Sequence, residues 1–286
     1  MRWRVALRGC GCRSFLHLLR QRLSGTIRHL FPISSWLSRS MRIASLSDIH
    51  GNLAALDAVL EDIQAQGVDL IVNLGDIASG PLQPRETVDR LMALNLPTIR
   101  GNHERQVLAG DPSRMGASDQ YAFEQLRPDQ LAWFASLPVL RYIKDDVLLV
   151  HGSAQHDQTY FLESLSEKGC RAATHDEVLS RAEDADAKLV LCGHTHMPRA
   201  MKLVDGRFIV NPGSVGLQAY SDAYPFAHTI ETGSPHARYA IVTEQAGEWS
   251  AEFRAVEYAW DDAAAIAERR GRPDWAVALR TGRAKD

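Results

Sequence analysis

The stretch Ser45-Leu46-Ser47-Asp48-Ile49-His50-Gly51-Asn52 decides the fold, because it ends an apolar run with a carboxylate and an imidazole two residues apart. Side chains two residues apart on a strand project from the same side. Asp48 and His50 can therefore reach one metal ion from the end of one strand. A single Asp-x-His pattern recurs by chance in unrelated sequences, so the prediction depends on whether further motifs along the chain agree with it.

Four further polar groups repeat this arrangement, each at the C-terminal end of a short apolar run and beside a glycine. They are Gly75-Asp76, Gly101-Asn102-His103-Glu104, His151-Gly152 and Gly193-His194-Thr195-His196. Burying this many Asp, Asn and His side chains without partners would cost several kcal/mol for each group. Packing alone is a poor explanation for them, and metal binding is the better hypothesis.

The order of the apolar patterns predicts an α/β fold. A strand over 41–47 is followed by an amphipathic helix over 52–66, which Gly67 ends, and by a second buried strand over 70–74. A strand, helix and strand of this length form a βαβ unit with parallel strands and a right-handed crossover. Ligands are expected at the carboxyl ends of such strands, which is where the polar groups lie.

The rest of the chain predicts further helices and then a run of strands. Helices are expected over 85–95, over 118–137 with an interruption at Pro128, and over 175–183 and 262–270, with a short strand over 98–100. Strand patterns follow at 139–142, 147–151, 189–192, 201–204, 208–210, 239–243 and 249–258, with hairpin turns at Asp145-Asp146, Asp205-Gly206 and Ala246-Gly247. Two facing sheets with helices outside accommodate this order.

Residues 1–40 differ from the rest of the chain in charge. They carry eight arginines and no acidic residue, whereas the remainder carries 24 basic and 35 acidic residues. The segment is either an extension outside the fold, with Met41 opening the domain, or an organelle transit peptide or membrane-surface helix. We favour the extension, because residues 41–46 run directly into the first strand. We therefore expect one domain over 41–286, with a helical tail over about 261–286.

Composition excludes several classes of protein. Nothing approaches the ~20 consecutive apolar residues of a membrane span, so no transmembrane segment is expected. The cysteines are scattered, which argues against a disulfide framework and favours a cytoplasmic location, with an organelle as the alternative. The acidic body argues against a nucleic-acid partner. A homodimer through an exposed sheet edge or the C-terminal helices is left open. The cysteines are Cys10, Cys12, Cys170 and Cys192.

The candidate metal ligands are two carboxylates, one amide and four imidazoles. Mixed nitrogen and oxygen donors without thiolate suit Mn²⁺, Fe, Zn²⁺, Co²⁺ or Ni²⁺ and do not suit Ca²⁺ or an iron-sulfur cluster. The set is too large for one tetrahedral ion, and a carboxylate shared between two ions resolves the count. The residues are Asp48, His50, Asp76, Asn102, His151, His194 and His196.

Taken in this order, the motifs Asp-x-His, Gly-Asp, Gly-Asn-His-Glu, His and Gly-His-x-His resemble those of the calcineurin-like metallophosphoesterase superfamily. The resemblance covers roughly residues 41 to 260. The segments 80–84 (Gly-Pro-Leu-Gln-Pro) and 211–216 (Asn-Pro-Gly-Ser-Val-Gly) further resemble its small, cap-less bacterial and archaeal phosphodiesterase branch. This implies a four-layer α/β/β/α sandwich of two mixed sheets flanked by helices, with a dinuclear site at one rim.

The resemblance also implies a role for each candidate residue. Asp48, His50 and His196 would hold the first ion, Asn102, His151 and His194 the second, and Asp76 would bridge them, with Mn²⁺ as the expected metal. A hydroxide bridging the ions would attack the phosphorus, and His103 would protonate the leaving oxygen or stabilise the developing charge. The expected activity is hydrolysis of a phosphodiester or phosphomonoester of a small molecule such as a nucleotide.

Two other functions stay open. The first is a nuclease acting on DNA or RNA, which the acidic body disfavours. The second is a non-catalytic interaction scaffold, because a retromer subunit keeps this fold as an interaction module. That subunit lacks the histidine of Gly-Asn-His, whereas His103 is present here, and this favours catalysis.

Several residues near the motifs have less certain roles. Glu104 either bonds a ligand histidine or lies solvated at a helix start, and Asn52 either belongs to the motif or caps the first helix. Asp57 is expected on an exposed helix face, and His156 is the one further histidine expected near substrate.

The related branch often continues Asn-Pro-Gly-Ser-Val-Gly with Gln-Pro-Arg. Here residues 217–220 read Leu-Gln-Ala-Tyr, which leaves the substrate open.

Overall fold

The structure is a computed structural model that describes residues 40–144 and 146–284. The expectations for the basic leader therefore fall outside the described residues, apart from Ser40. Within the described ranges, no helix combines the length and the apolar composition that a membrane span requires.

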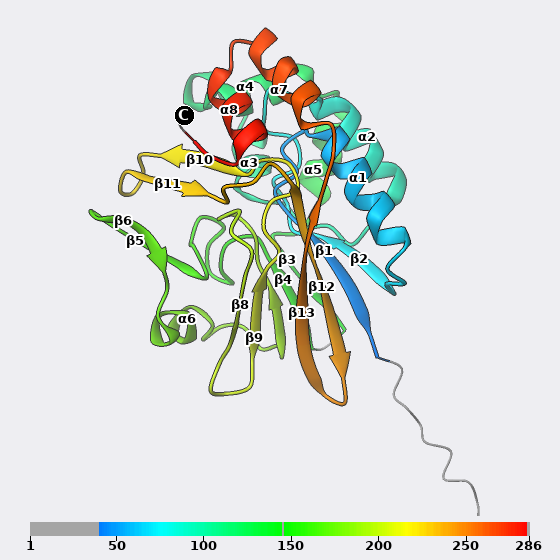
Figure 1. Ribbon diagram of the computed structural model, residues 1–286, viewed down its shortest axis with the longest axis vertical. Helices are drawn as coiled ribbons and strands as arrows, with labels where there is room; N and C mark the ends of the chain where they lie inside the picture. Colours follow the sequence, from blue (N-terminus) through cyan, green and yellow to red (C-terminus); the bar gives the residue numbers. More distant parts are fainter. Residues whose placement is uncertain (1–39, 145, 285–286) are drawn as a thin grey trace, which may run out of the picture. The chain divides into compact units, whose positions relative to one another are not determined.

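The first sheet contains the predicted βαβ unit (Figure 1). Strand β1 (Arg42–Leu46) pairs in parallel with β2 (Leu70–Asn73), and α1 (Leu53–Gln64) connects them. Helix α1 forms because its apolar residues recur every three or four positions and share one buried face. Two long strands, β12 (Ala237–Gln245) and β13 (Glu248–Val256), complete the sheet in the order β13-β12-β1-β2.

The second sheet is mixed and has the order β3-β4-β7-β9-β8. Its three central strands are parallel to one another, and each edge strand is antiparallel to its neighbour. The carboxyl ends of the central strands therefore share one edge of the sheet. The strands are β3 (Leu140–Ile143), β4 (Val147–Val150), β7 (Leu189–Leu191), β8 (Arg199–Lys202) and β9 (Phe208–Asn211).

The two sheets and their helices form the predicted α/β/β/α layers. Alternate residues of β1 show the packing, because Ile43 enters the apolar core between the sheets while Ala44 faces the helices. Leu149 and Leu191 of the second sheet meet Ile43 in the inner core. The outer face of the first sheet is covered by α1, α2 (Pro84–Leu94), α4 (Ala117–Gln125) and α5 (Pro128–Ser136), and that of the second by α6 (His175–Arg181).

A smaller apolar cluster joins the C-terminal helices to the body. Helices α7 (Trp260–Arg269) and α8 (Pro273–Thr281) pack against each other and against Leu82 and Leu217. Helix α8 also contacts the two-stranded ribbon β10–β11, and β11 contacts the ribbon β5–β6 (Figure 1). The ribbons comprise β5 (Glu163–Ser166), β6 (Gly169–Ala172), β10 (Ala219–Asp222) and β11 (His228–Glu231).

Two of the predicted hairpin turns are confirmed. Ala246 and Gly247 have φ values of +54° and +86°, as both central residues of a tight two-residue hairpin turn require. Asp205-Gly206 lies in the turn between β8 and β9. The turn predicted at Asp145-Asp146 includes Asp145, which lies outside the described residues.

The strand predicted over 98–100 is wrong. Thr98 makes a single parallel bridge to Asn73. Because Asn73 is the last residue of β2, the pairing does not extend beyond this bridge. The chain then enters α3 (Asn102–Leu108), and the short helix η1 (Pro112–Arg114) comes next. The ribbons β5–β6 and β10–β11 were not predicted, because their strands lack the alternation of apolar and polar residues that marks a half-buried strand.

Candidate metal centre

The polar groups that the sequence singles out lie where strands end. Asp48 and His50 follow β1, Asp76 follows β2, His151 follows β4, and His194 and His196 follow β7, while Asn102 opens α3. Both sheets thus deliver side chains to one rim of the sandwich. The arrangement results from the parallel strands, whose carboxyl ends meet at the same edge.

The backbone at these positions is locally strained. Eight non-glycine residues in the described ranges have positive φ, and five of them are candidate ligands: Asp48, His50, Asp76, His194 and His196. Such left-handed conformations are rare outside glycine and cluster at functional sites. Asp48 and His50 therefore converge through a left-handed loop after β1 ends at Leu46. The predicted alternation along an extended strand is wrong.

The side chains form two groups of three. Ligand atoms of Asp48, His50 and His196 lie within 4.8 Å of one another, and those of Asp76, His151 and His194 do the same. The groups are adjacent, because His151 Nε2 lies 3.0 Å from Asp76 Oδ2 and 4.0 Å from Asp48 Oδ1. Asn102 Oδ1 lies 3.1 Å from the same nitrogen. All seven candidate ligands therefore occupy one site.

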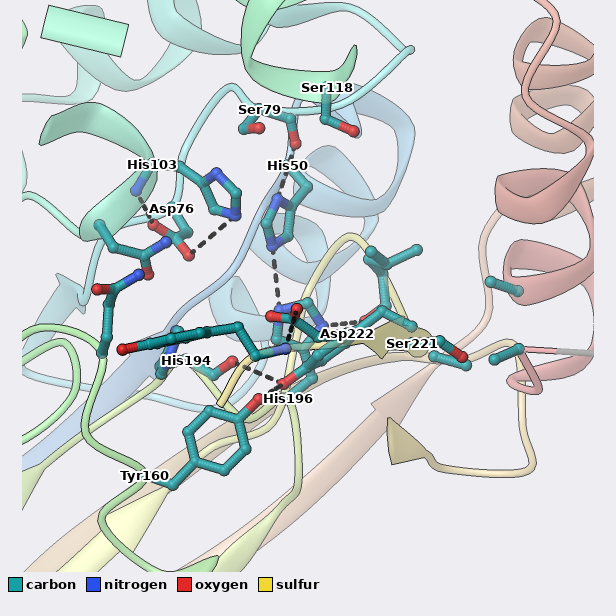
Figure 2. A pocket seen from close by; sticks show the side chains of 18 of the residues that line it. His50, Asp76, Ser79, His103, Ser118, Tyr160, His194, His196, Ser221 and Asp222 are labelled. Carbon is teal, nitrogen blue, oxygen red and sulfur yellow. Dashed lines mark hydrogen bonds and ion pairs between the residues drawn. The ribbon is translucent and has the colours of Figure 1, made fainter. Parts of the chain in front are cut away.

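Hydrogen bonds to main-chain carbonyls fix the imidazoles. The Nδ1 atoms of His50, His151 and His196 lie 2.7–2.8 Å from the carbonyl oxygens of Ser79, Leu74 and Leu217. Each Nδ1 must carry the proton and donate it, which leaves Nε2 of His50 and His196 as bare acceptors. Nε2 of His151 instead lies between oxygens of Asp76 and Asn102, and although burial opposes protonation, Asp76 raises the pKa of His151 to about 9. Figure 2 shows His50 facing His196, and their Nε2 atoms are 3.0 Å apart. Two facing lone pairs repel unless a cation binds them, so the residues fit divalent metal ions.

Two glycines make room for this site. A Cβ on Gly101 would lie 2.2 Å from Asp76 Oδ1, and a Cβ on Gly193 would lie 2.0 Å from Ser47 Oγ. Any side chain at either position would displace an aspartate or its support. The glycines next to the motifs are therefore required by close approach.

The electrostatics keep three imidazoles neutral. Burial lowers the pKa of His50 to about 4 and that of His194 to about 3, and it holds the pKa of His196 well below its usual range. Burial raises the pKa of Asp48 to about 7, whereas the charges of His151 and His103 outweigh burial and keep the pKa of Asp76 well below its usual range. Neutral imidazoles and an ionised Asp76 are the forms that bind metal.

His103 is held differently from the candidate ligands. Its Nδ1 lies 2.7 Å from Asp119 Oδ1, and its Nε2 lies 3.9 Å from Asp76 Oδ2. Burial opposes protonation of His103, but Asp76 and Asp119 together raise its pKa to about 10. Ser79 Oγ donates a second hydrogen bond, of 2.6 Å, to Asp119. Asp119 could not be predicted from the sequence, because an acidic residue in the first turn of a helix usually serves the helix dipole.

Neither interpretation of Glu104 is correct. Its side chain is buried at the start of α3, and its hydrogen bonds go to the backbone and not to a ligand histidine. Its carboxylate accepts hydrogen bonds from the backbone N–H groups of Asp76, Ile77 and Gly101 at 2.7–2.9 Å. Glu104 therefore joins the loop of Asp76 and Ile77 to the loop of Gly101 through hydrogen bonds.

Other residues from the sequence analysis have structural roles around the site. Asn52 Oδ1 accepts from Ala55 N at 3.2 Å, so it caps α1, and its amide also donates to Gly216 O at 2.9 Å. Asp57 pairs with Arg90 on the surface. In the 211–216 loop, Ser214 Oγ donates to Asp48 O at 2.7 Å, and this bond supports the strained loop.

A cleft of about 640 Å³ opens over the site. Figure 2 shows Ser79 and Ser118 on one side of it and Tyr160 on the other. His156 lines the cleft as expected, and so do Tyr224 of the β10–β11 ribbon and residues of α8 that the sequence did not indicate. The floor of this cleft is formed by His103 and five of the candidate ligands, and the wall by β10–β11 and α8. The five ligands are His50, Asp76, Asn102, His194 and His196, and Asp48 and His151 lie beneath them.

Two tyrosines pack against the Gly-His-x-His segment. The Tyr160 ring meets His194 edge-on at 5.0 Å between centroids, and the Tyr220 ring meets His196 at 4.8 Å. Their hydroxyls lie 2.6 Å apart, and His228 Nε2 lies 2.8 Å from Tyr160 Oη. The two tyrosines therefore restrain His194 and His196, one histidine from each group of three candidate ligands. No short sequence motif predicts this network.

The family comparison agrees with this site. Residues 41–233 match the calcineurin-like phosphoesterase superfamily domain. The chain belongs to that superfamily, and its two donor groups are candidate sites for divalent metal ions.

Two relatives extend the comparison. An uncharacterised protein of Methanocaldococcus jannaschii is 30% identical over 196 residues, which cover 61% of this chain and 76% of that protein. A metallophosphoesterase from Sphaerobacter thermophilus, known from its crystal structure, is 29% identical with a TM-score of 0.65, covering 85% of this chain and 99% of that one. Neither name specifies a substrate, so the substrate class must be argued from the cleft.

Proposed function

We propose that the protein is a metal-dependent phosphoesterase that hydrolyses a phosphodiester or phosphomonoester of a small molecule, nucleotides included. One observation carries the proposal. Two groups of three metal-binding side chains, all buried except the half-buried His194, lie side by side at and beneath the floor of one cleft, with the imidazole of His103 next to them.

In this proposal Asp48, His50 and His196 hold one ion, Asn102, His151 and His194 hold the other, and Asp76 lies between them. Two bound divalent cations, with Mn²⁺ as the expected metal, would neutralise phosphoryl oxygens and lower the pKa of water. The short contacts of His151 with both Asp76 and Asn102 support the second set, and the bare Nε2 atoms of His50 and His196 support the first.

The chain's own acid is His103. Its Nδ1–H donates to Asp119, so its Nε2–H is free to donate a proton to the leaving oxygen. The side chain is 28% exposed and lines the cleft, which gives a substrate access to it. Asp119 acts through His103 by fixing its orientation and favouring its charged form.

The cleft supports a small substrate. Its volume of about 640 Å³ is in the range of sites for small molecules and far exceeds the space that a single phosphate needs. Among the described residues that line it, Arg272 is the one Lys or Arg. A nuclease tracks its substrate with a basic groove, which the described part of the cleft lacks.

The test is hydrolysis of bis(p-nitrophenyl) phosphate and p-nitrophenyl phosphate by the full chain, stripped of metal and reloaded with Mn²⁺ or each alternative ion. Turnover is expected with at least one ion. His103→Ala should lower kcat on the order of 10²-fold while two metal equivalents stay bound, because the variant loses the acid and keeps the ligands.

His236→Ala is the matched control, because His236 bonds to Ser234 and is not among the residues that line the cleft. Full activity in His103→Ala would contradict the assignment of the acid. Two bound equivalents with no turnover of either ester would contradict the enzymatic function and favour an interaction scaffold.

A further inference from the structure

Helix α8 places a guanidinium group in the wall of the cleft. Arg272, the N-cap residue of α8, lines the cleft together with Trp275 of the first turn. It is the one Lys or Arg that does so among the described residues. Helix α8 lies outside the residues that the family domain covers, so this group is not part of the shared motif set.

The guanidinium is held in one orientation by three neighbours. Its Nε and Nη2 donate to Asp274 at 3.0 and 2.7 Å, and its Nη1 donates to Ser118 Oγ at 2.9 Å. Its central carbon lies 5.6 Å from the centroid of the Trp275 ring. A group fixed in this way loses little further side-chain entropy on binding a ligand.

The contacts leave part of the guanidinium unused. Arginine has five N–H donors, and three are engaged, so one remains on each terminal nitrogen. The Ser118 hydroxyl accepts from Arg272, and its own hydrogen can still be donated. Asp274 accepts from the Nε–Nη2 edge of the guanidinium and so orients the other edge. The side chain of Asp274 is 58% exposed, so water screens its negative charge.

Trp275 lies next to both this group and the metal centre. The indole lies with its ring 6.0 Å from the His50 ring, centroid to centroid, and Arg272 lies over the indole. Arg272 and His50 therefore both lie next to the Trp275 ring, so a ligand with one phosphoryl group at the floor can extend along the indole toward Arg272.

The indole is itself built into the body of the protein. Gly80 has no side chain where the indole packs, and a Cβ there would lie 2.6 Å from Trp275 Cη2. The adjoining loop is bound to α7, because Arg270 Nη1 donates to Pro81 O at 2.8 Å and also to Leu82 O. Residues 80–84 (Gly-Pro-Leu-Gln-Pro) thus form part of the surface against which α8 packs.

We propose that Arg272, with Ser118, forms a subsite for a second anionic group of the substrate, a phosphate or a carboxylate. The proposal rests on the proposed function, because it places the first phosphoryl group at the metal centre. A guanidinium fork matches both oxyanions, and a charge-assisted pair is stronger than a neutral hydrogen bond. The substrate class is a phosphoester with a further negative charge a few bonds from the scissile group.

The test measures binding without turnover. The probes are propane-1,3-bisphosphonate, 4-phosphonobutanoate and propylphosphonate, none of which is an ester, titrated by calorimetry into the full chain loaded with Mn²⁺. The wild type should bind one or both doubly charged probes about tenfold more tightly than propylphosphonate, which corresponds to one charge-assisted contact. The tighter of the two shows whether the subsite prefers phosphate or carboxylate.

Arg272→Gln should bind all three probes alike, and Ser118→Ala should lose two- to threefold of the preference while leaving the N-cap residue of α8 unchanged. Arg280→Gln is the matched control on α8, because Arg280 pairs with Glu268 and Asp261 outside the cleft, and it should keep the full preference. Equal binding of all probes by the wild type, or a full preference in Arg272→Gln, would show that the Arg272–Asp274 pair only caps the helix.

The same titrations separate this proposal from the proposed function. A probe preference that depends on Arg272, in a protein that hydrolyses neither p-nitrophenyl ester, would support the subsite and contradict catalysis. Turnover of an ester together with equal binding of all probes would support catalysis and contradict the subsite.

Discussion

The floor of the cleft and its wall differ in how strongly the chain fixes each side chain. At the floor, Asp48 and Asp76 are buried, lie in left-handed loops and are surrounded by histidines whose protons are committed to main-chain carbonyls. On the wall, Tyr224 is 75% exposed at the tip of the β10–β11 ribbon. We therefore expect the floor to tolerate little change and the exposed tip of the β10–β11 ribbon to tolerate much, whereas Arg272 in the α8 part of the wall is held in one orientation.

Asp76→Asn should have the largest effect, because the Asp76 carboxylate lies 3.0 Å from His151 and 3.9 Å from His103. The amide keeps the shape and tolerates the positive φ of this position, but it removes the charge that faces His151 and His103. Hydrolysis should fall on the order of 10³-fold, and bound metal should fall below two equivalents by elemental analysis. Asp57→Asn, on the exposed face of α1, is the control. Unchanged metal content and rate in Asp76→Asn would show that the charge of Asp76 is required neither for metal binding nor for hydrolysis.

Asp119→Asn should have the next largest effect, because it changes the acid and leaves the ligands in place. Burial disfavours the charged form of His103, but Asp76 and Asp119 raise its pKa to about 10. His103 can donate a proton below this pKa and loses that ability as the pH rises through it. Two bound cations would lower the pKa of His103 in the wild type and in the variant alike.

Removing the charge of Asp119 should therefore move the alkaline limb of the kcat profile to lower pH and reduce kcat on the order of 10- to 100-fold. Ser79→Ala removes the other partner of Asp119 without removing charge and should leave the limb in place. An unshifted limb in Asp119→Asn, with metal retained, would mean that the group titrating there is not His103.

The sequence could predict most of the floor because its residues follow strand ends. An apolar run that stops at Leu46 or Val150 places the next polar residue at the rim, whatever the rest of the fold does. The left-handed turns at Asp48 and His50 could not be predicted from spacing, because the same two-residue interval also suits an extended strand. The fold class could be predicted from the βαβ unit, whose periodicities are strong.

The wall could not be predicted for a different physical reason. Arg272 and Trp275 become part of the cleft through the packing of α8 on Leu82 and Leu217, contacts that join distant parts of the chain. A helix start with Arg-Pro-Asp-Trp has no local pattern that indicates a ligand. Glu104 was misassigned for a similar cause, since its partners are backbone N–H groups of another loop and leave no trace in the side-chain sequence.

Glu104→Gln should have an intermediate effect that links stability to the floor. The glutamine oxygen can accept only part of the three backbone N–H bonds, and its NH₂ group would face a donor. Unfolding free energy should fall by about 1–3 kcal/mol in urea titrations, and activity by about tenfold as the loop of Asp76 loosens. Glu86→Gln, an exposed acid in the first turn of α2, is the control. A purely kinetic loss without destabilisation would contradict the role of Glu104 in joining the two loops.

Tyr224→Ala should have the smallest effect and defines the other end of the comparison. Its ring is mostly in water, so its removal should change the unfolding free energy by less than about 0.5 kcal/mol. It lines the cleft, so KM for the aromatic diester should rise about two- to fivefold at constant kcat if the ring stacks on the leaving group. Phe226→Ala tests the same ribbon tip at a residue that is not among those lining the cleft. A fall in kcat or in metal content for Tyr224→Ala would mean that the wall also positions the floor.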